Sequence, residues 1–455
     1  MTCGSFPSWG RLKGEPRKAH SISVIKEDAL GNKAFSDDIL HGQEQSLLAY
    51  GNGRSYGDSC HNDAGVLIHR GSNNEILDFD VETGVMHCQA GVLLADVLAM
   101  AIPHGYFLAV TPGTRFVTVA GAIANDVHGK NHHSRGSFGA HVERFSLWRS
   151  DGVMRECSAS ENSDLYAATI GGMGLTGIIL SATIRLMKVP SPDVCQTIIK
   201  FDNLAGYFAK IDDVDKNFEY SVAWIDQLAR GAKLGRGVMM AGDHVARKDA
   251  PREVAAPRYG VPFQPPVNLL NRFTLKAFNA AYFARARAGE ALVEWASYFY
   301  PLDGIKDWNR LYGPKGLFQH QSLYPSDNAE ETTAHLIECA QKHGHASFLT
   351  VLKRFGDNVS PGLLSFPKPG FTLTLDFANQ GPATLKMLDA LDEITLKARG
   401  RINPYKDARM SAKTFGASFP KWHSLEAMRD PALMSDFWRR TAKSLRFSAK
   451  LAAKG

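Results

Sequence analysis

The sequence has few cysteines, and they are dispersed along the chain. Its six cysteines include no C-x-x-C pair and follow no regular spacing, which argues against a disulfide framework and against a zinc cage. We therefore expect the chain to fold in a reducing compartment, the cytoplasm. With 455 residues, of which 44% are apolar, it can bury a large core and form two or three domains.

Signals for export, for membrane spanning and for nucleic-acid binding are also missing. The first ten residues, MTCGSFPSWG, lack the basic start and apolar run of a signal peptide. The longest uncharged stretch, residues 97–114, contains Pro103, Gly105, Pro112 and Gly113, which break a spanning helix. No run of five like charges occurs, so we expect no nucleic-acid partner.

The formal net charge of +6 is compatible with several partners. An anionic substrate, the phosphates of a cofactor and an acidic membrane surface would all be attracted by a positive field. A mildly basic surface without any partner explains the charge equally well. The charge alone therefore selects none of these functions.

The hydrophobic pattern predicts an α+β fold. Short β-branched or alternating runs at residues 65–69, 85–89 and 177–185 are separated by turns rich in Gly and Asn, and residues 93–104 have the pattern of an amphipathic helix. The proline-punctuated stretch 188–192 predicts a domain boundary. Beyond it, amphipathic segments mix with expected strands at 348–353 and 371–377, and the tail after residue 401 has a helical pattern.

The strongest local motif is YGNGRSYGD at residues 50–58. Its three glycines can direct successive backbone N–H groups toward one point, which makes a concavity suited to a pyrophosphate. Taken alone, the motif is explained equally by a tight turn between strands.

A second cluster, at residues 111–139, mixes small apolar residues with Gly, Thr and His. Small side chains let a flat ring system approach the backbone closely. His128, His132 and His133 raise the alternative of a metal site, but no carboxylate or cysteine is spaced to complete a ligand set, so we expect no metal. For His132 and His133, ordinary hydrogen-bonded loop histidines are a further alternative.

The third cluster, GMGLTG at residues 172–177, matches G-x-G-x-x-G. That dinucleotide motif must follow a strand and open a helix. Here a helical stretch at 164–170 precedes the motif and a strand follows it. The order argues against a nicotinamide-binding unit and leaves a flavin contact as the functional interpretation.

Together these motifs resemble those of a known flavoprotein superfamily. GRSYGD (53–58), TPGTR (111–115), HGKNHHS (128–134) with GSFG (136–139), and GGMGLTGI (171–178) are similar to the PCMH-type FAD-binding domain of the vanillyl-alcohol oxidase and p-cresol methylhydroxylase superfamily. Within it, the chain looks most like the decaprenylphosphoryl-β-D-ribose 2′-oxidase family. Further matches are AWID (223–226), WNRLYGP (308–314), FQHQ (318–321), LSFP (364–367) and YKD (405–407).

The resemblance implies a two-part FAD-binding domain, formed by residues 1–190 and completed by residues 401–455, with an α+β substrate-binding cap domain at 191–400. It also implies cofactor contacts from all three glycine motifs: Gly53, Arg54, Ser55, Tyr56, Gly57, Thr111, Pro112, Gly113, Thr118, Gly121, Ala122, Asn125, His128, Gly129, Asn131, His132, Gly174, Gly177 and Ile178. Members with covalent flavin often carry His where this chain has Arg54. We therefore expect FAD to be bound non-covalently.

Oxidation of a carbinol to a ketone by hydride transfer also requires the hydroxyl proton to leave. The resemblance assigns Lys406 to the substrate hydroxyl, matches His128 to the family's active-site histidine and places Tyr56 beside the flavin ring. A buried lysine with a lowered pKa could take the proton. On the sequence alone, a surface Lys406 paired with Asp407 is the simpler explanation.

Substrate contacts are expected mainly from the second half of the chain. Gln319 and Gln321 alternate on one strand face, so both can point into the same pocket. The resemblance adds Lys130, Trp224, Lys353 and Thr374. Without it, Lys353 would be read as a strand-surface lysine and Trp224 as a core residue.

Two positions depart from the family pattern. Thr374 stands where the family often has an active-site cysteine, so a thiol-directed covalent inhibitor should lose its anchor. Asn403 stands where the family commonly has tyrosine, which puts the fine geometry of the site in question.

The substrate implied by the resemblance is a polyprenylphosphoryl pentose whose 2-hydroxyl becomes a ketone, with a separate short-chain reductase completing an epimerisation. The residues themselves support only an alcohol with an anionic or polar handle. An aldonolactone or other soluble sugar oxidase, and a non-enzymatic flavin- or lipid-binding protein, are the alternatives.

Residues 268–288 predict an amphipathic helix that combines aromatic and basic residues and contains no acidic residue. Such a helix could make a peripheral contact with anionic lipid at the inner face of the membrane. A cap-domain helix that packs its aromatic side chains into the core explains the pattern at least as well.

Overall fold

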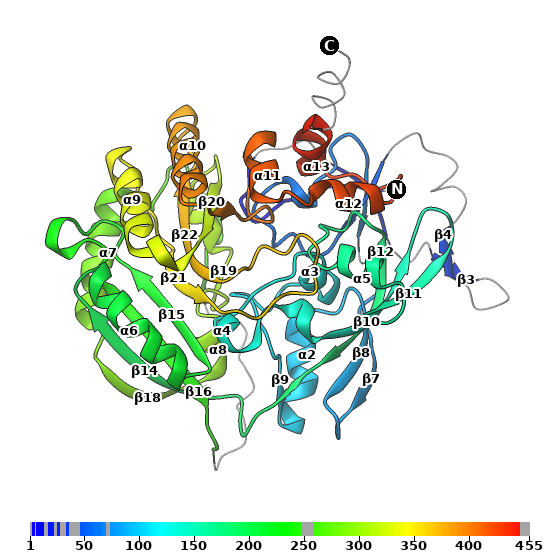
Figure 1. The fold of residues 1–455 in the computed structure, drawn as a ribbon, viewed down its shortest axis with the longest axis horizontal. Coiled ribbons are helices and arrows are strands. Elements are labelled where there is room, and N and C mark those ends of the chain that lie inside the picture. Colours follow the sequence, from blue (N-terminus) through cyan, green and yellow to red (C-terminus); the bar gives the residue numbers. More distant parts are fainter. Residues whose placement is uncertain are drawn as a thin grey trace.

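The computed structural model describes residues 2–4, 6–12, 17–21, 25–27, 33–35, 46–69, 73–247 and 259–445. Within them the chain forms helices and mostly antiparallel sheets, which confirms the expected α+β class (Figure 1). None of the helices in these ranges combines the length and apolar character that crossing a bilayer requires.

Two sheets make up the N-terminal part of the described chain. A four-stranded sheet has the order β1-β2-β6-β5, with β1 at Thr2–Gly4, β2 at Arg17–Ser21, β5 at Leu47–Tyr50 and β6 at Val66–His69. A five-stranded antiparallel sheet has the order β11-β10-β12-β8-β7, with β7 at Ile76–Asp80, β8 at Val85–Gln89, β10 at Val142–Trp148, β11 at Met154–Ser158 and β12 at Ile178–Arg185. The strands predicted at 65–69, 85–89 and 177–185 are therefore confirmed.

The helices of this part are short. The predicted helix at 93–104 is α2 (Leu94–Ala101), continued by a 3-10 turn, η3 (Ile102–His104). The others are α3 (Val119–Ala124), α4 (His132–Arg135) and α5 (Ser163–Thr169). Helices α3 and α5 contact the five-stranded sheet, whereas α4 contacts β21 (Thr350–Phe355) of the sheet described next. Because α5 precedes the 172–177 motif and β12 follows it, the predicted helix-before-strand order is confirmed.

The middle of the chain is built on an eight-stranded antiparallel sheet of order β18-β14-β16-β15-β21-β22-β20-β23. Its strands are β14 (Val194–Phe201), β15 (Tyr220–Ile225), β16 (Gly237–His244), β18 (Gly289–Val293), β20 (Leu317–Tyr324), β21 (Thr350–Phe355), β22 (Gly370–Ala378) and β23 (Arg401–Ile402). Helices α6 (Leu204–Asn217), α9 (Ala329–Lys342) and α10 (Pro382–Lys397) cover one of its faces (Figure 1).

Strand β22 shows why the helices cover that face and not the other, although both faces are buried. Phe371, Leu373, Leu375 and Phe377 belong to the apolar cluster shared with α9 and α10. The alternate positions, Thr372, Thr374 and Asp376, lie on the opposite face, because side chains alternate along a strand. The strand predicted at 371–377 is confirmed and extends by one residue at each end.

One expected strand has different limits. The strand predicted at 348–353 begins at Thr350, two residues later, and runs to Phe355. Phe348 does not join the ladder. Its ring instead packs 5.5 Å from that of Phe278 and 6.3 Å from that of Trp308, centroid to centroid.

The C-terminal helices α11 (Ala412–Ser418), α12 (Trp422–Met428) and α13 (Asp436–Arg440) return to the N-terminal part (Figure 1). Leu47 pairs with Leu433 in a parallel bridge, and Phe415 and Trp438 share an apolar cluster with Leu48. The tail therefore packs against the N-terminal part, whereas the division of the chain at residues 190 and 400 stays a prediction.

The α-helices and strands not yet described are α7 (Arg272–Arg285), α8 (Trp295–Phe299) and short two-stranded pairings. The pairings join β3 (Ile25–Glu27) with β4 (Lys33–Phe35), β9 (Tyr106–Phe107) with β13 (Met187–Lys188), and β17 (Tyr259–Gly260) with β19 (Ile305–Lys306). Helix α7 begins at a side-chain cap, because Asn271 Oδ1 accepts from the N–H groups of Phe273 and Thr274.

Candidate active site

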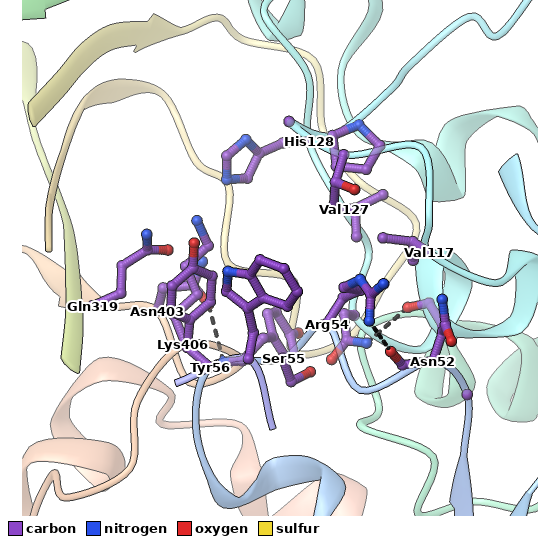
Figure 2. A pocket seen from close by; sticks show the side chains of 18 of the residues that line it. Asn52, Arg54, Ser55, Tyr56, Val117, Val127, His128, Gln319, Asn403 and Lys406 are labelled. Atoms are coloured by element: carbon purple, nitrogen blue, oxygen red, sulfur yellow. Dashed lines mark hydrogen bonds between the residues drawn. The ribbon is translucent and has the colours of Figure 1, made fainter. Parts of the chain in front are cut away.

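A cavity of about 570 Å³ lies between the N-terminal part and the face of the eight-stranded sheet opposite α6, α9 and α10. This volume is in the range of small-molecule and cofactor sites. Figure 2 shows its interior, with Tyr56, Gln319, Asn403 and Lys406 gathered on one side and Arg54 on the other.

All three glycine motifs meet at this cavity. The expected cofactor residues that line it are Gly53, Arg54, Ser55, Tyr56, Thr111, Pro112, Gly113, Thr118, Gly121, Asn125, His128, Gly129, Gly174, Gly177 and Ile178. They come from the segment after β5, from the region around α3 and from the turn before β12. Segments that are far apart in the sequence therefore form one continuous wall.

Four expected cofactor residues lie behind that wall instead. Gly57 packs against the chain near Lys406, since a Cβ on it would lie 1.7 Å from the carbonyl oxygen of Asp407. Ala122 is fully buried in the core. Asn131 donates to the carbonyl oxygen of Ala109 at 2.9 Å, and the ring of His132 lies 4.4 Å from that of Phe355.

The shape of the wall fits a flat, phosphate-bearing cofactor. At Gly113 and Gly174, no atom of the described residues, chain neighbours aside, lies within 4 Å of the position that a Cβ would take. Gly174 also has a positive φ of 70°, a conformation that glycine adopts without strain. A ligand can therefore approach the backbone at both points, and the Arg54 side chain supplies a positive charge to the same cavity.

His128 is held by hydrogen bonds from two sides. Lys353 Nζ lies 3.0 Å from His128 Nδ1 and donates to the carbonyl oxygen of Gly129 at 2.8 Å. Gln321 Nε2 lies 3.1 Å from His128 Nε2. Burial, together with the positive charges of Lys353 and Lys406, holds the pKa of His128 well below its ordinary value. The imidazole is therefore neutral at pH 7.

Lys406 lines the cavity just after β23, and its Nζ lies 5.7 Å from the centroid of the Tyr56 ring. The alternative of a surface lysine paired with Asp407 is wrong, because the Asp407 carboxylate accepts from Arg440 at 2.8 Å and from the backbone N–H of Met410 at 2.7 Å. Burial lowers the pKa of Lys406, and the negative charge of Asp376 opposes that shift.

Two further lysines reach the same cavity. Lys353, on β21, is therefore not a surface residue of the strand. Lys130 donates to the carbonyl oxygen of Tyr298 and lies 4.4 Å from the centroid of that ring. Burial lowers the pKa of Lys130 to about 7.

The two glutamines of β20 lie on the same strand face, but at different depths. Gln319 lines the cavity and donates to Asp376 Oδ1. Gln321 lies behind it, where it contacts His128, donates to Thr372 Oγ1 at 3.0 Å and accepts from Asn403 Nδ2 at 2.9 Å. Of this pair only Gln319 lines the cavity, whereas Trp224 and Thr374 line it as expected.

Several residues of the site were not anticipated from the sequence. Asp376 lies directly behind Gln319, and Phe278 and Tyr282 of α7 line the cavity. For Asp376 the signal was present, since Thr372, Thr374 and Asp376 alternate along one strand. For the two aromatic residues the helical pattern alone gave no indication of a cavity.

Comparisons with known proteins agree with this geometry. Residues 39–158 match the family model described as FAD binding domain. The chain is 36% identical to decaprenylphosphoryl-beta-D-ribose oxidase of Mycolicibacterium smegmatis, over 97% of this chain and 99% of that protein. It is 30% identical to L-gulonolactone oxidase of Mus musculus, over 37% of this chain and 39% of that protein.

The fold, the glycine-lined cavity and these matches define an FAD-dependent oxidoreductase with a PCMH-type FAD-binding domain. Because the 36% identity extends over nearly the full length of both proteins, the chain belongs to the decaprenylphosphoryl-β-D-ribose oxidase family.

Proposed function

We propose that this enzyme oxidises a secondary alcohol on a sugar, namely the 2-hydroxyl of a polyprenylphosphoryl pentose, to a ketone. FAD, when bound, supplies the hydride acceptor. The observation that carries the proposal is the convergence of Lys406, Lys353, Lys130 and neutral His128 on the same cavity that the three glycine motifs line.

Lys406 takes the hydroxyl proton in this proposal. Its lowered pKa makes the neutral amine accessible near physiological pH, which a base requires. Tyr56 lies beside it, and Gln319 presents a side-chain amide to the same side of the cavity (Figure 2). These groups can orient the sugar hydroxyls while Lys406 holds the proton.

An anionic handle on the substrate follows from the charges around the cavity. Its lining includes Arg54 and the three lysines, against the two carboxylates of Asp126 and Asp303. Asp126 already accepts from the Ser137 hydroxyl at 2.8 Å, and Asp303 from the Arg115 N–H at 2.9 Å. Burial lowers the pKa values of the three lysines, but their N–H groups can still donate to an anion, and Arg54 remains charged at pH 7, so the lining favours a phosphodiester over a neutral sugar.

A lipid tail fits the far end of the same cavity. There the lining is apolar, with Trp224, Phe278, Tyr282, Phe348 and Leu349. The rings of Trp224 and Tyr282 lie 4.6 Å apart, so α7 borders the cavity directly. A polyprenyl chain could leave the site along this border.

Helix α7 and the chain before it also support a peripheral membrane contact. Residues 259–288 contain no Asp or Glu and include Arg272, Lys276, Arg285 and Arg287. The large apolar side chains left exposed there are Tyr259, Phe263, Val267, Leu269, Phe273, Phe278 and Tyr282, with Phe273 88% exposed. Packing into the core accounts for Leu275, which is 1% exposed, but not for Phe273.

The test is anaerobic mixing of the FAD-loaded enzyme with polyprenylphosphoryl ribose, followed by flavin absorbance. We expect bleaching by this substrate and none by polyprenyl phosphate, which has the lipid and the charge but no sugar. Bleaching by an aldonolactone instead would establish the soluble sugar oxidase, and a flavin that no alcohol bleaches would establish a non-enzymatic binding protein. The ketone should then be reduced by a separate short-chain reductase, which completes an epimerisation.

A further inference from the structure

Asp376 is a buried carboxylate that the proposed chemistry has not yet used. It lies on β22, is 0% exposed, and stands directly across from Gln319 of β20 in the strand register. Gln319 donates to its Oδ1, and the hydroxyl of Tyr312 lies near enough to act on the carboxylate as a second hydrogen-bond donor. A buried carboxylate remains unfavourable unless a positive charge also compensates it.

The charged and titratable groups that act on Asp376 come from three segments. Tyr56 belongs to the first glycine loop and Tyr312 to the 3-10 helix η6 (Trp308–Tyr312), while Lys406 follows β23. Burial raises the pKa of Asp376, and the attraction of Lys406, the one cation among these groups, opposes that shift.

Lys406 has a wider set of charged and titratable neighbours than Asp376. The Tyr56 ring lies against its ammonium group, and the positive charge of Lys406 acts on His128 and Lys353. Asp376 is the carboxylate whose field acts on Lys406 in return. In a cavity with three lysines, this carboxylate is therefore the counter-charge of the proposed base.

We propose that Asp376 is a positioning residue that acts through Lys406, by holding the positive charge that Lys406 acquires when it takes the substrate's hydroxyl proton. The inference rests on the proposed role of Lys406. The O–H bond breaks and an N–H bond forms on Lys406 as the carbinol hydride leaves for the flavin. Asp376 supplies the negative charge that faces the new ammonium group and takes no proton from the substrate.

The experiment compares the pH dependence of flavin reduction in single turnover with polyprenylphosphoryl ribose. Reduction requires neutral Lys406, so its rate rises with pH through the pKa of that lysine. Removing the carboxylate by Asp376→Asn removes an attraction that raises this pKa, so the rising limb should move to lower pH by on the order of one unit. The plateau should fall by about tenfold, because the ammonium product is less stabilised.

The control is Asp392→Asn, another buried aspartate, which pairs with His320 and Arg409 on the opposite face of β20. Its rising limb should stay in place. Asp376→Glu, which keeps the charge, should keep the limb near that of the parent. If Asp376→Asn loses its flavin, Asp376→Ser replaces it, since this variant also removes the charge.

A plateau that falls with an unmoved limb would show that Asp376 serves only the packing of β20 on β22, and would overturn the inference. Lys406→Ala in the same assay separates this failure from that of the proposed function. If Lys406→Ala is reduced as fast as the parent, the base is misassigned. If flavin reduction in Lys406→Ala is slow and the rising limb of Asp376→Asn is unmoved, Lys406 keeps its role as the base and only the role proposed for Asp376 is wrong.

Discussion

Burial changes the chemistry of single residues in this cavity more than their sequence neighbours do. Lys406 is followed directly by Asp407, yet that carboxylate binds arginines, and the field that acts on Lys406 comes from Asp376, thirty positions earlier. His128 likewise contacts Gln321 and Lys353, which are remote in the sequence. Long-range partners therefore determine which protonation states these side chains adopt.

Replacing the proposed base tests its role directly. In Lys406→Ala, FAD should remain bound, because the glycine walls are unchanged, and flavin reduction should slow by about a hundredfold or more, the usual effect of losing a positioned base. Stopped-flow absorbance under anaerobic conditions measures this. Reduction at the rate of the parent would remove Lys406 from the mechanism.

Arg54 determines how the flavin is attached. Its guanidinium donates to the carbonyl oxygen of Asn52 at 2.6 Å and lies 4.9 Å from the centroid of the Trp9 ring. An arginine side chain does not form the covalent bond to flavin that a histidine at this position can form. Acid precipitation should therefore release intact FAD into the supernatant. Yellow colour that stays with the washed pellet would contradict non-covalent binding.

At the scale of elements, the sequence predicted which side chains of β20 and β22 share a strand face. It did not predict which of them line the cavity and which lie behind its wall. Gln319 and Gln321 share a face as their spacing requires, but Gln321 lies behind His128 because Asn403 and Thr372 bind its amide there. Asn403 is thus part of the chain of hydrogen bonds that holds the imidazole. The pattern of one strand cannot reveal such contacts, since they depend on which strand lies beside it.

Helix α7 should mediate binding to anionic membranes. Its basic residues and exposed aromatic side chains would be attracted to anionic lipid. In liposome co-sedimentation, we expect binding that requires anionic lipid and weakens with salt. The double variant Arg285→Glu and Arg287→Glu should bind much less.

Lys233→Glu with Lys315→Glu is the control for this experiment, because it makes the same change of charge outside residues 259–288 and should retain binding. Equal sedimentation of the α7 double variant and the parent, or no binding by either, would exclude α7 as the membrane contact.

At the scale of the whole molecule, the local motifs predicted which segments line the cavity. They did not predict how distant segments pack together around it. The three glycine motifs mark backbone that must curve or approach a ligand, a demand that glycine satisfies locally. The apolar face of the sheet was also readable from β22. The joining of Leu47 with Leu433, and of α7 with the cavity border, depends on packing between distant segments. Only the resemblance to a family indicated that the tail returns to the N-terminal part.

Acid should destabilise the whole molecule partly through His132. Its side chain is 1% exposed, and neither ring nitrogen has a hydrogen-bond partner within the described residues. Burial lowers the pKa of His132 from 6.5 to about 3. Above pH 6.5 the ring is neutral in both the folded and unfolded states, so it contributes no pH dependence.

Below pH 6.5 the unfolded chain takes up the proton and the folded protein does not, so the free energy of unfolding decreases as the pH falls. At pH 5 the decrease from this residue is about 2 kcal/mol. In His132→Leu, saturated with FAD, the fall of Tm between pH 7 and pH 5 should therefore be smaller than in the parent by a few degrees. His335→Gln, a change at an exposed histidine of α9, should follow the parent. Parallel Tm curves for His132→Leu and the parent would show that the ring of His132 is protonated as readily in the folded protein as in the unfolded chain.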